Sequence, residues 1–218
     1  DTIVIGGGTA GAAMAAHLAA CGNQSVLLLE AGPDYGALTD KRWPAELLDA
    51  RVVAESHDWG YSNTGATGEN QHALPRARVL GGCSAHNGCI ELWGHRNDYD
   101  NWADLLGDLK SSGWSTDELL PFFHKAAKAL RVRDFAEEEI TPFHQACIDT
   151  IANQAGISRV DDLNNLDETS GVGTAPVNIY NGLRWNTALA YLDPLRDSEP
   201  LAIIGDCLVE KVRVSNHR

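Results

Sequence analysis

Three glycines near the start of the chain have the spacing that cradles the pyrophosphate of a dinucleotide. Gly6, Gly8 and Gly11 form a G-x-G-x-x-G pattern between an apolar run at residues 3–5 and an alanine-rich, helix-forming run at residues 12–20. The first glycine permits a tight turn, the second lets a pyrophosphate approach the main chain, and the third lets the helix pack closely on the strand. Free amides and the positive end of the helix dipole attract phosphate at such a helix start.

An acidic residue follows the next apolar run at the distance that a ribose requires. The run at residues 25–29 ends in Glu30, nineteen residues after Gly11, where a carboxylate can accept both ribose hydroxyls. The glycine pattern alone also fits a purely conformational turn. A strand before it, a helix after it and an acid at this distance favour dinucleotide binding.

A second stretch of small residues covers residues 76–90. Eight of its fifteen residues are Gly, Ala, Ser or Cys, which leaves the backbone open to close contact. Such a stretch suits the approach of a large flat ligand, and it equally suits a tight buried turn. Arg76 and Arg78 favour an anionic ligand.

The composition excludes some classes of partner. The 218 residues can bury a core, and 17 Lys and Arg against 30 Asp and Glu give a formal net charge of −13. This charge repels nucleic acid and anionic lipid surfaces. No apolar run approaches the roughly 20 residues that cross a bilayer, and no secretory leader is recognisable. Five scattered cysteines without metal-ligand spacing predict reduced thiols in a cytoplasmic protein with no metal site.

The remaining segments predict the elements that position these residues. Residues 33–74 read as a long insertion with a helix only at 43–53. Helices are expected from residue 97, with Trp102, Leu105 and Leu106 in the core, and then over 117–130 after a cap at Ser115 or Thr116. Further helices are expected over 141–154 and 185–196, and strands over 172–179, 202–204 and 208–214. Residues 137–139 read as a solvated helix start.

In several motifs and in their order, the chain resembles the glucose-methanol-choline oxidoreductases, which bind FAD and oxidise alcohols. The resemblance rests on GGGTAG, VLLLEAG, DWGY, RARVLGGCSAHNG, NDYDNWADL with SGWSTDELLPFF, and GLRWNTALAYLDPL. It implies an α/β, Rossmann-like FAD-binding fold with part of a substrate-binding domain. The FAD-binding domain is expected over residues 1–130 and 185–218, and the partial substrate domain over 131–184.

The resemblance also assigns cofactor contacts. Gly6, Gly8 and Gly11, with the neighbouring Thr9 and Ala10, should hold the pyrophosphate, and Glu30, with Ala31 beside it, the ribose. Arg76, Leu80, Gly82 and Ser84 should line the phosphate and ribityl region. Asn87, Gly88, Cys89 and Ile90 should pass beside the flavin ring, Val209 should hold the adenine edge, and Trp59 should also contact the cofactor.

His86 is the candidate point of covalent attachment. Cys83 and His86 stand where choline oxidase-like members carry Cys and His, and that histidine is joined to the flavin in those enzymes. A neutral imidazole nitrogen is nucleophilic, and a flavin methyl group can become electrophilic. The alternative is that His86 only packs beside the flavin or bonds a backbone carbonyl.

The catalytic histidine of the family, paired with a second His or Asn, lies beyond the stretch that this chain matches. No catalytic residue is therefore expected in the chain, and the remainder is expected as a second polypeptide or a continuation. Residues 131–142 also depart from the family pattern. A flavin-containing lyase and a non-catalytic FAD-binding subunit remain alternatives. The sequence leaves open the alcohol, the electron acceptor and the formation of a homo-oligomer.

Overall fold

The computed structural model describes residues 1–63, 72–107, 113–167 and 170–214. These residues form two compact units. One combines Asp1–Cys89 with Tyr180–Arg218, and the other is Ile90–Ile179. None of the helices among the described residues is long and apolar enough to cross a membrane.

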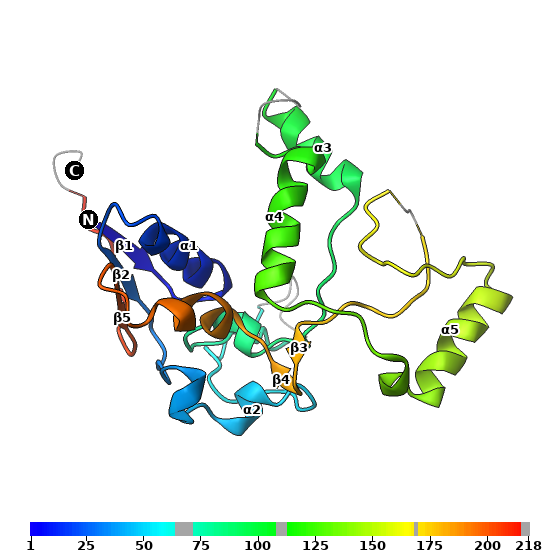
Figure 1. The fold of residues 1–218 in the computed structure, drawn as a ribbon, viewed down its shortest axis with the longest axis horizontal. Coiled ribbons are helices and arrows are strands. Elements are labelled where there is room, and N and C mark those ends of the chain that lie inside the picture. The colour runs from blue at the N-terminus through cyan, green and yellow to red at the C-terminus, as the bar shows by residue number, and fades with distance from the viewer. Residues whose placement is uncertain (64–71, 108–112, 168–169, 215–218) are drawn as a thin grey trace. The chain divides into compact units, whose positions relative to one another are not determined.

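The first unit contains a three-stranded parallel sheet (Figure 1). Strands β1 (Thr2–Ile5), β2 (Val26–Leu29) and β5 (Leu201–Ile204) lie in the order β1-β2-β5. Val26 pairs with Thr2 on one side and with Leu201 on the other. The predicted strands at 3–5, 25–29 and 202–204 are thus confirmed within one or two residues.

Helix α1 (Thr9–Ala20) covers one face of this sheet and contacts β1 and β2. Its buried side chains are all methyl groups, namely Ala12, Ala15, Ala16 and Ala19. Small side chains bring the helix axis close to the strands, and the closest point is Gly11. A Cβ on Gly11 would overlap the carbonyl oxygen of Gly6, so only glycine fits there.

The helix predicted over 185–196 is irregular. The segment η4 (Ala188–Leu192) is a π-helix, and η5 (Asp193–Leu195) is a 3-10 turn. The buried Asn186 side chain accepts the Leu189 amide at 3.1 Å, and Pro194 has no N–H to continue an α-helical ladder. The sequence pattern identified an apolar helical segment and missed this local geometry.

Two more predictions for this unit are wrong: one helix is shorter than expected, and one strand does not form. The helix expected over 43–53 is the short α2 (Ala45–Leu48), because Asp49 is already extended and bridges to Leu183. Residues 208–214 form no strand, since within the described chain no strand lies beside them to pair with. The small elements of the unit are η1 (Leu38–Asp40), η2 (Gly82–Ala85) and β4 (Leu183–Arg184), which pairs with β3 (Ile179–Tyr180).

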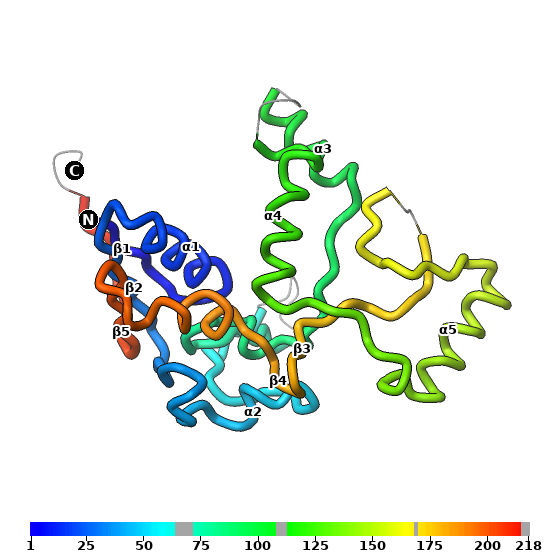
Figure 2. Tube along the Cα trace, viewed as in Figure 1, coloured from blue at the N-terminus to red at the C-terminus, as the bar shows by residue number. Residues whose placement is uncertain are grey.

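The regular elements of the second unit are mostly helices, joined by long irregular stretches (Figure 2). It contains α3 (Arg96–Leu105), α4 (Thr116–Ala129), the 3-10 turn η3 (Glu137–Glu139) and α5 (Pro142–Gln154). The predicted cap of α4 is confirmed, since Glu118 accepts the amide of Ser115 at 3.2 Å and its hydroxyl at 2.8 Å. The helix expected over 141–154 is confirmed within one residue, and Thr141 caps it by accepting the His144 amide at 3.3 Å.

Two predictions for the second unit fail. Trp102, Leu105 and Leu106 are exposed rather than buried in a core, and Leu105 retains 85% of its accessible surface. Residues 172–179 form isolated bridges at Val172 and Val177 and enter β3 only at Ile179, because the chain meets different partners at each point. The helical pattern correctly predicted α3, but it did not show that these apolar side chains are exposed.

The boundaries of the two compact units differ from the boundaries of the predicted domains. Helices α3 and α4 belong to the unit Ile90–Ile179, whereas the prediction counted residues up to 130 with the FAD-binding domain. The assignment of cofactor and substrate roles to these parts stays a prediction.

Gly11→Ala tests the packing of α1 on β1. The added methyl group must displace the carbonyl of Gly6, so we expect a loss of roughly 1–3 kcal/mol in the free energy of unfolding, measured by denaturant titration. Gly8→Ala is the control, because its methyl group meets only Gly82 Cα, at 3.8 Å. This control should cost less than about 1 kcal/mol, and equal losses for both variants would contradict the packing argument.

Candidate cofactor site

A cavity of about 340 Å³ lies in the first unit at the carboxyl ends of all three parallel strands. Ile5 and Gly6 follow from β1, Leu29 to Ala31 from β2, and Cys207 to Val209 from the segment after β5. This edge is where open parallel sheets bind their ligands. Seven residues predicted as cofactor contacts line it: Gly6, Gly8, Glu30, Ala31, Trp59, Gly82 and Val209.

Glu30 braces the first glycine turn from inside the cavity. Its carboxylate accepts the amide of Gly7 at 2.7 Å and the amide of Gly32 at 2.8 Å, and the residue is only 6% exposed. Both donors are backbone groups, so the buried negative charge is compensated by oriented peptide dipoles. Each carboxylate oxygen keeps a second lone pair, which is what a ribose hydroxyl would require.

The two glycine-rich stretches meet main chain to main chain beside the cavity. The amide of Gly81 donates to the carbonyl of Gly7 at 2.7 Å, and the amide of Ser84 donates to the hydroxyl of Thr9 at 3.2 Å. Gly82 has a positive φ of 54°, and a Cβ there would lie 2.6 Å from the Gly8 Cα. A side chain on residue 82 is thus excluded where the backbone borders the cavity.

Three predicted contacts point into the protein interior. Leu80 belongs to the hydrophobic core, and the Cys89 thiol is fully buried. The Ser84 hydroxyl donates to the Gly81 carbonyl at 2.6 Å and lies 2.9 Å from the Thr187 hydroxyl. Ser84 thereby fastens the second glycine turn to the segment that precedes η4. Contact of these residues with a cofactor stays a prediction.

His86 lies in a chain of polar contacts. Its Nε2 is 2.8 Å from the carbonyl oxygen of Ser56, which can only accept, so Nε2–H is the donor and, in a neutral ring, Nδ1 carries the lone pair. The neighbouring His57 contacts the Ser56 hydroxyl through Nδ1 and the Tyr35 hydroxyl through Nε2, the latter at 2.6 Å. Glu46 accepts the Ser56 amide at 3.0 Å.

Two residues in this cluster, Glu46 and His57, have lowered pKa values. Hydrogen bonds from Ser56 lower the pKa of Glu46, which therefore stays ionised. Burial lowers the pKa of His57 and outweighs the opposing charge of Glu46, so His57 stays neutral. A neutral imidazole donates one hydrogen bond and accepts one, as its two hydroxyl neighbours allow.

The other predicted residues lie at the surface or outside this cavity. Arg76 is exposed, and its guanidinium donates to the Pro75 carbonyl at 2.6 Å. Asn87 and Gly88 are exposed, Thr9 and Ala10 begin α1, Gly11 packs that helix on β1, and Ile90 belongs to the second unit. Five further residues line the cavity and were not predicted as contacts: Ile5, Leu29, Ala77, Cys207 and Leu208. The only signal for four of them is their position at or after a strand end, and Ala77 is placed there by its bridge to Asp58.

Arg78 also acquires a definite partner. Its guanidinium lies 5.6 Å from the centroid of the Trp59 ring, which is stacked on Tyr61 at 5.8 Å. This cation–π contact fixes the indole that borders the cavity. The two segments are also joined by main-chain bonds, since the Trp59 amide donates to the Arg76 carbonyl at 2.9 Å.

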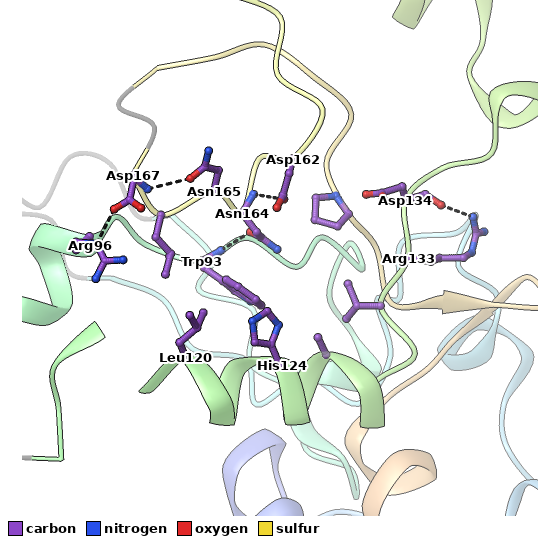
Figure 3. A pocket seen from close by; sticks show the side chains of 14 residues that line it. Trp93, Arg96, Leu120, His124, Arg133, Asp134, Asp162, Asn164, Asn165 and Asp167 are labelled. Atoms are coloured by element: carbon purple, nitrogen blue, oxygen red, sulfur yellow. Dashed lines mark hydrogen bonds and ion pairs between the residues drawn. The ribbon is translucent and has the colours of Figure 1, made fainter. Parts of the chain in front are cut away.

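A larger hollow of about 570 Å³ lies in the second unit (Figure 3). His124 of α4 meets the Trp93 ring edge-on, with 5.4 Å between the ring centroids. Most of its polar lining is already paired: Arg96 with Asp167 at 2.5 Å, and Asp162 with the Asn164 amide at 2.7 Å. The hollow therefore offers few free groups to a ligand. No group of three His, Cys, Asp or Glu that could hold a metal occurs among the described residues.

The parallel sheet, the glycine turn and the acid at the end of β2 define a nucleotide-binding protein of the Rossmann type. A family model described as GMC oxidoreductase matches residues 1–218. The chain belongs to the GMC oxidoreductase family.

Among curated proteins, an oxygen-dependent choline dehydrogenase of Photobacterium profundum is 31% identical over 99% of this chain and 39% of its own length. The mitochondrial choline dehydrogenase of Mus musculus is 32% identical over 96% of this chain and 37% of its own length. The chain thus spans about two fifths of the length of these relatives.

Solved structures give the same fold. Pyridoxine 4-oxidase from Mesorbium loti superposes with a TM-score of 0.79 at 28% identity, over 94% of this chain and 42% of that one. A formate oxidase gives a TM-score of 0.72 at 21% identity, over 94% of this chain and 38% of that one. The Rossmann-like fold predicted from the sequence is confirmed.

Glu30→Gln tests the brace on the glycine turn. The amide nitrogen of glutamine would face a backbone N–H where the carboxylate now accepts, so we expect a loss of about 1–3 kcal/mol in unfolding free energy. The measurement is thermal or denaturant unfolding of the protein. Glu55→Gln at an exposed position is the control and should change stability by less than about 0.5 kcal/mol. Equal stability of the two variants would show that Glu30 does not brace the turn.

Proposed function

We propose that this chain is the cofactor-binding portion of an FAD-dependent oxidoreductase that oxidises a primary or secondary alcohol. The single observation that carries the proposal is the cavity at the carboxyl ends of β1, β2 and β5, where Gly8, Gly82 and Glu30 meet. Membership in the GMC oxidoreductase family supports it. Two relatives whose names mention choline and pyridoxine suggest a small alcohol as substrate.

The residues present fit a dinucleotide. Gly8 and Gly82 leave a side-chain-free backbone beside the cavity, and the first amides of α1 begin there. These groups would hold the pyrophosphate, because free N–H groups at a helix start favour anions. Glu30 would accept ribose hydroxyls, and the main chain at Val209 would hold the adenine edge. Bound FAD supplies a flavin ring that accepts a hydride from a substrate.

The residues of this chain would bind and orient the cofactor, and the proton of the alcohol would be removed elsewhere. We place the base that removes it in a polypeptide that continues this chain or joins it as a second chain. Oxygen or another acceptor would then regenerate the oxidised flavin.

The five cysteines are all unpaired in the structure, which supports a reducing compartment such as the cytoplasm.

His86 is the proposed attachment point of the flavin. Its contact with the Ser56 carbonyl fixes the ring and leaves one nitrogen with its lone pair. That nitrogen would bond to the flavin methyl carbon, and this carbon would lose a proton. The electron pair of the broken C–H bond would pass to the flavin ring and from there to oxygen or another acceptor, which is the oxidant that the attachment requires.

Gly8→Ala should separate cofactor binding from folding. A methyl group at residue 8 meets no close atom of the protein, so stability is retained, but it occupies the approach of the pyrophosphate. We expect the dissociation constant for FAD, measured by flavin fluorescence, to rise at least about tenfold. Unchanged affinity would place the pyrophosphate elsewhere.

His86→Ala tests the attachment. After acid precipitation of the purified protein, we expect a yellow pellet and a flavin-bearing peptide over residues 76–90 in the natural protein. In His86→Ala the colour should move to the supernatant, and the exposed His17→Ala should behave as the natural protein does. Released flavin in the natural protein would refute attachment and keep FAD binding. Absence of flavin would refute the proposed function, and bound flavin that no alcohol reduces would favour a lyase.

A further inference from the structure

Arg184 is a buried cation whose partners are backbone carbonyls. The residue lies in β4 and is 1% exposed. Its guanidinium donates to five carbonyl oxygens: Asn87 at 2.8 Å, Glu46 at 3.0 Å, Leu47 at 2.8 Å, Ala85 at 3.4 Å and Val52 at 2.8 Å. Among the residues that the structure describes, no carboxylate forms an ion pair with it.

Burial of a guanidinium costs free energy unless its N–H groups meet acceptors. A buried charge loses its hydration, and only well-directed hydrogen bonds compensate for that loss. The guanidinium has five N–H groups in a rigid plane, and here they meet five acceptors from two separate segments. Nε donates to Asn87 and Nη2 to Val52, while the two N–H groups of Nη1 are shared among Glu46, Leu47 and, at the longer 3.4 Å, Ala85. A lysine has only three donors on a flexible stem and cannot satisfy the same set. The geometry therefore requires arginine and joins residues 46–52 to residues 85–87.

The two carbonyls on the second segment flank His86 in the sequence. Arg184 binds the carbonyl of Ala85 on one side of His86 and that of Asn87 on the other. The imidazole itself is fixed from the opposite segment, since its Nε2 contacts the Ser56 carbonyl at 2.8 Å. Glu46, whose carbonyl Arg184 also binds, accepts the Ser56 amide at 3.0 Å. The backbone and the ring of His86 are thus held by one connected set of bonds.

The Cys89 thiol belongs to the same set. Burial raises the pKa of this thiol, and the charge and hydrogen bond of Arg184 oppose the rise. Cys89 has a positive φ of 62°, and its amide donates to the Asn87 side chain at 3.1 Å. A cysteine in the left-handed region is strained, so the turn after His86 depends on these contacts to keep its shape.

We propose that Arg184 is the positioning residue for His86, and that its guanidinium holds the loop of residues 85–89 in the conformation that presents His86 to the flavin. The inference deepens the proposed function and rests on it for the identity of the ligand. The holding of the loop by itself is a property of this chain and is measurable without flavin.

The test compares three variants of the protein: Arg184→Met, Arg184→Lys and Leu47→Ala. Leu47 is fully buried beside the guanidinium, so Leu47→Ala loosens the same region by a cavity while it keeps the carbonyl that Arg184 binds. Two quantities are measured with and without added FAD. They are the amide hydrogen exchange of residues 85–89 and the rate at which flavin becomes resistant to acid release.

For Arg184→Met we expect exchange at residues 85–89 to accelerate at least roughly tenfold, beyond any change in global stability. Attachment of flavin should slow by about tenfold or more, because the reacting nitrogen is no longer held in place. Arg184→Lys, which keeps the charge, should lie between Arg184→Met and the natural protein. Leu47→Ala should lower the unfolding temperature with little effect on either quantity.

Equal acceleration of exchange in Arg184→Met and Leu47→Ala at matched stability would overturn the proposal and leave Arg184 a general stabilising residue. Natural attachment kinetics in Arg184→Met would overturn it as well. If the natural protein attaches no flavin, the proposed attachment fails, and the exchange data without FAD still decide whether Arg184 holds the loop.

Discussion

The site depends on the direct main-chain contact between the two glycine turns. The amide of Gly81 donates to the carbonyl of Gly7, and a side chain on Gly82 would overlap the Gly8 Cα. Because these turns are 75 residues apart, they create the cavity wall only when the sheet, α1 and the segment before η4 are all in place. The contact therefore couples formation of the site to folding of the first unit.

Two buried charged side chains of the first unit, Glu30 and Arg184, act on the backbone rather than on another charge. Glu30 accepts two amides at the end of β2, and Arg184 donates to five carbonyls near β4. Such charges are stable in a protein interior only when oriented peptide groups replace water. Glu30 consequently fixes the first glycine turn, and Arg184 joins α2 and the residue Val52 to the end of η2 and the loop after it. Loops fixed in this way can present main-chain groups and an imidazole at defined positions.

The second unit has a different character. Its helices expose large apolar side chains, among them Leu105, Phe122 and Phe143, and its larger hollow is lined by polar groups that already pair with one another. The two glycine turns, Glu30 and the hydrogen-bonded His86 lie in the first unit. This division agrees with a chain that covers about two fifths of its relatives, in which further residues contribute to the whole protein.

The sequence by itself determined the features that follow from local rules. Glycine spacing, apolar runs and cap residues gave β1, α1, β2, α4 and α5, since hydrophobic periodicity and capping act over a few residues. The position of Glu30 at a strand end was equally readable. Motif order also identified the family before any contact was known.

Only the tertiary structure decided the features that depend on partners distant in the chain. The π-helical turn η4 depends on Asn186 and on the Ser84–Thr187 contact. The segment after β5 forms no strand, because no strand within the described chain lies beside it. The sequence analysis gave Arg184 no role, because nothing local shows that five carbonyls from two other segments converge on it. Long-range hydrogen bonds leave no periodic trace in a sequence, and they are what places His86 in this protein.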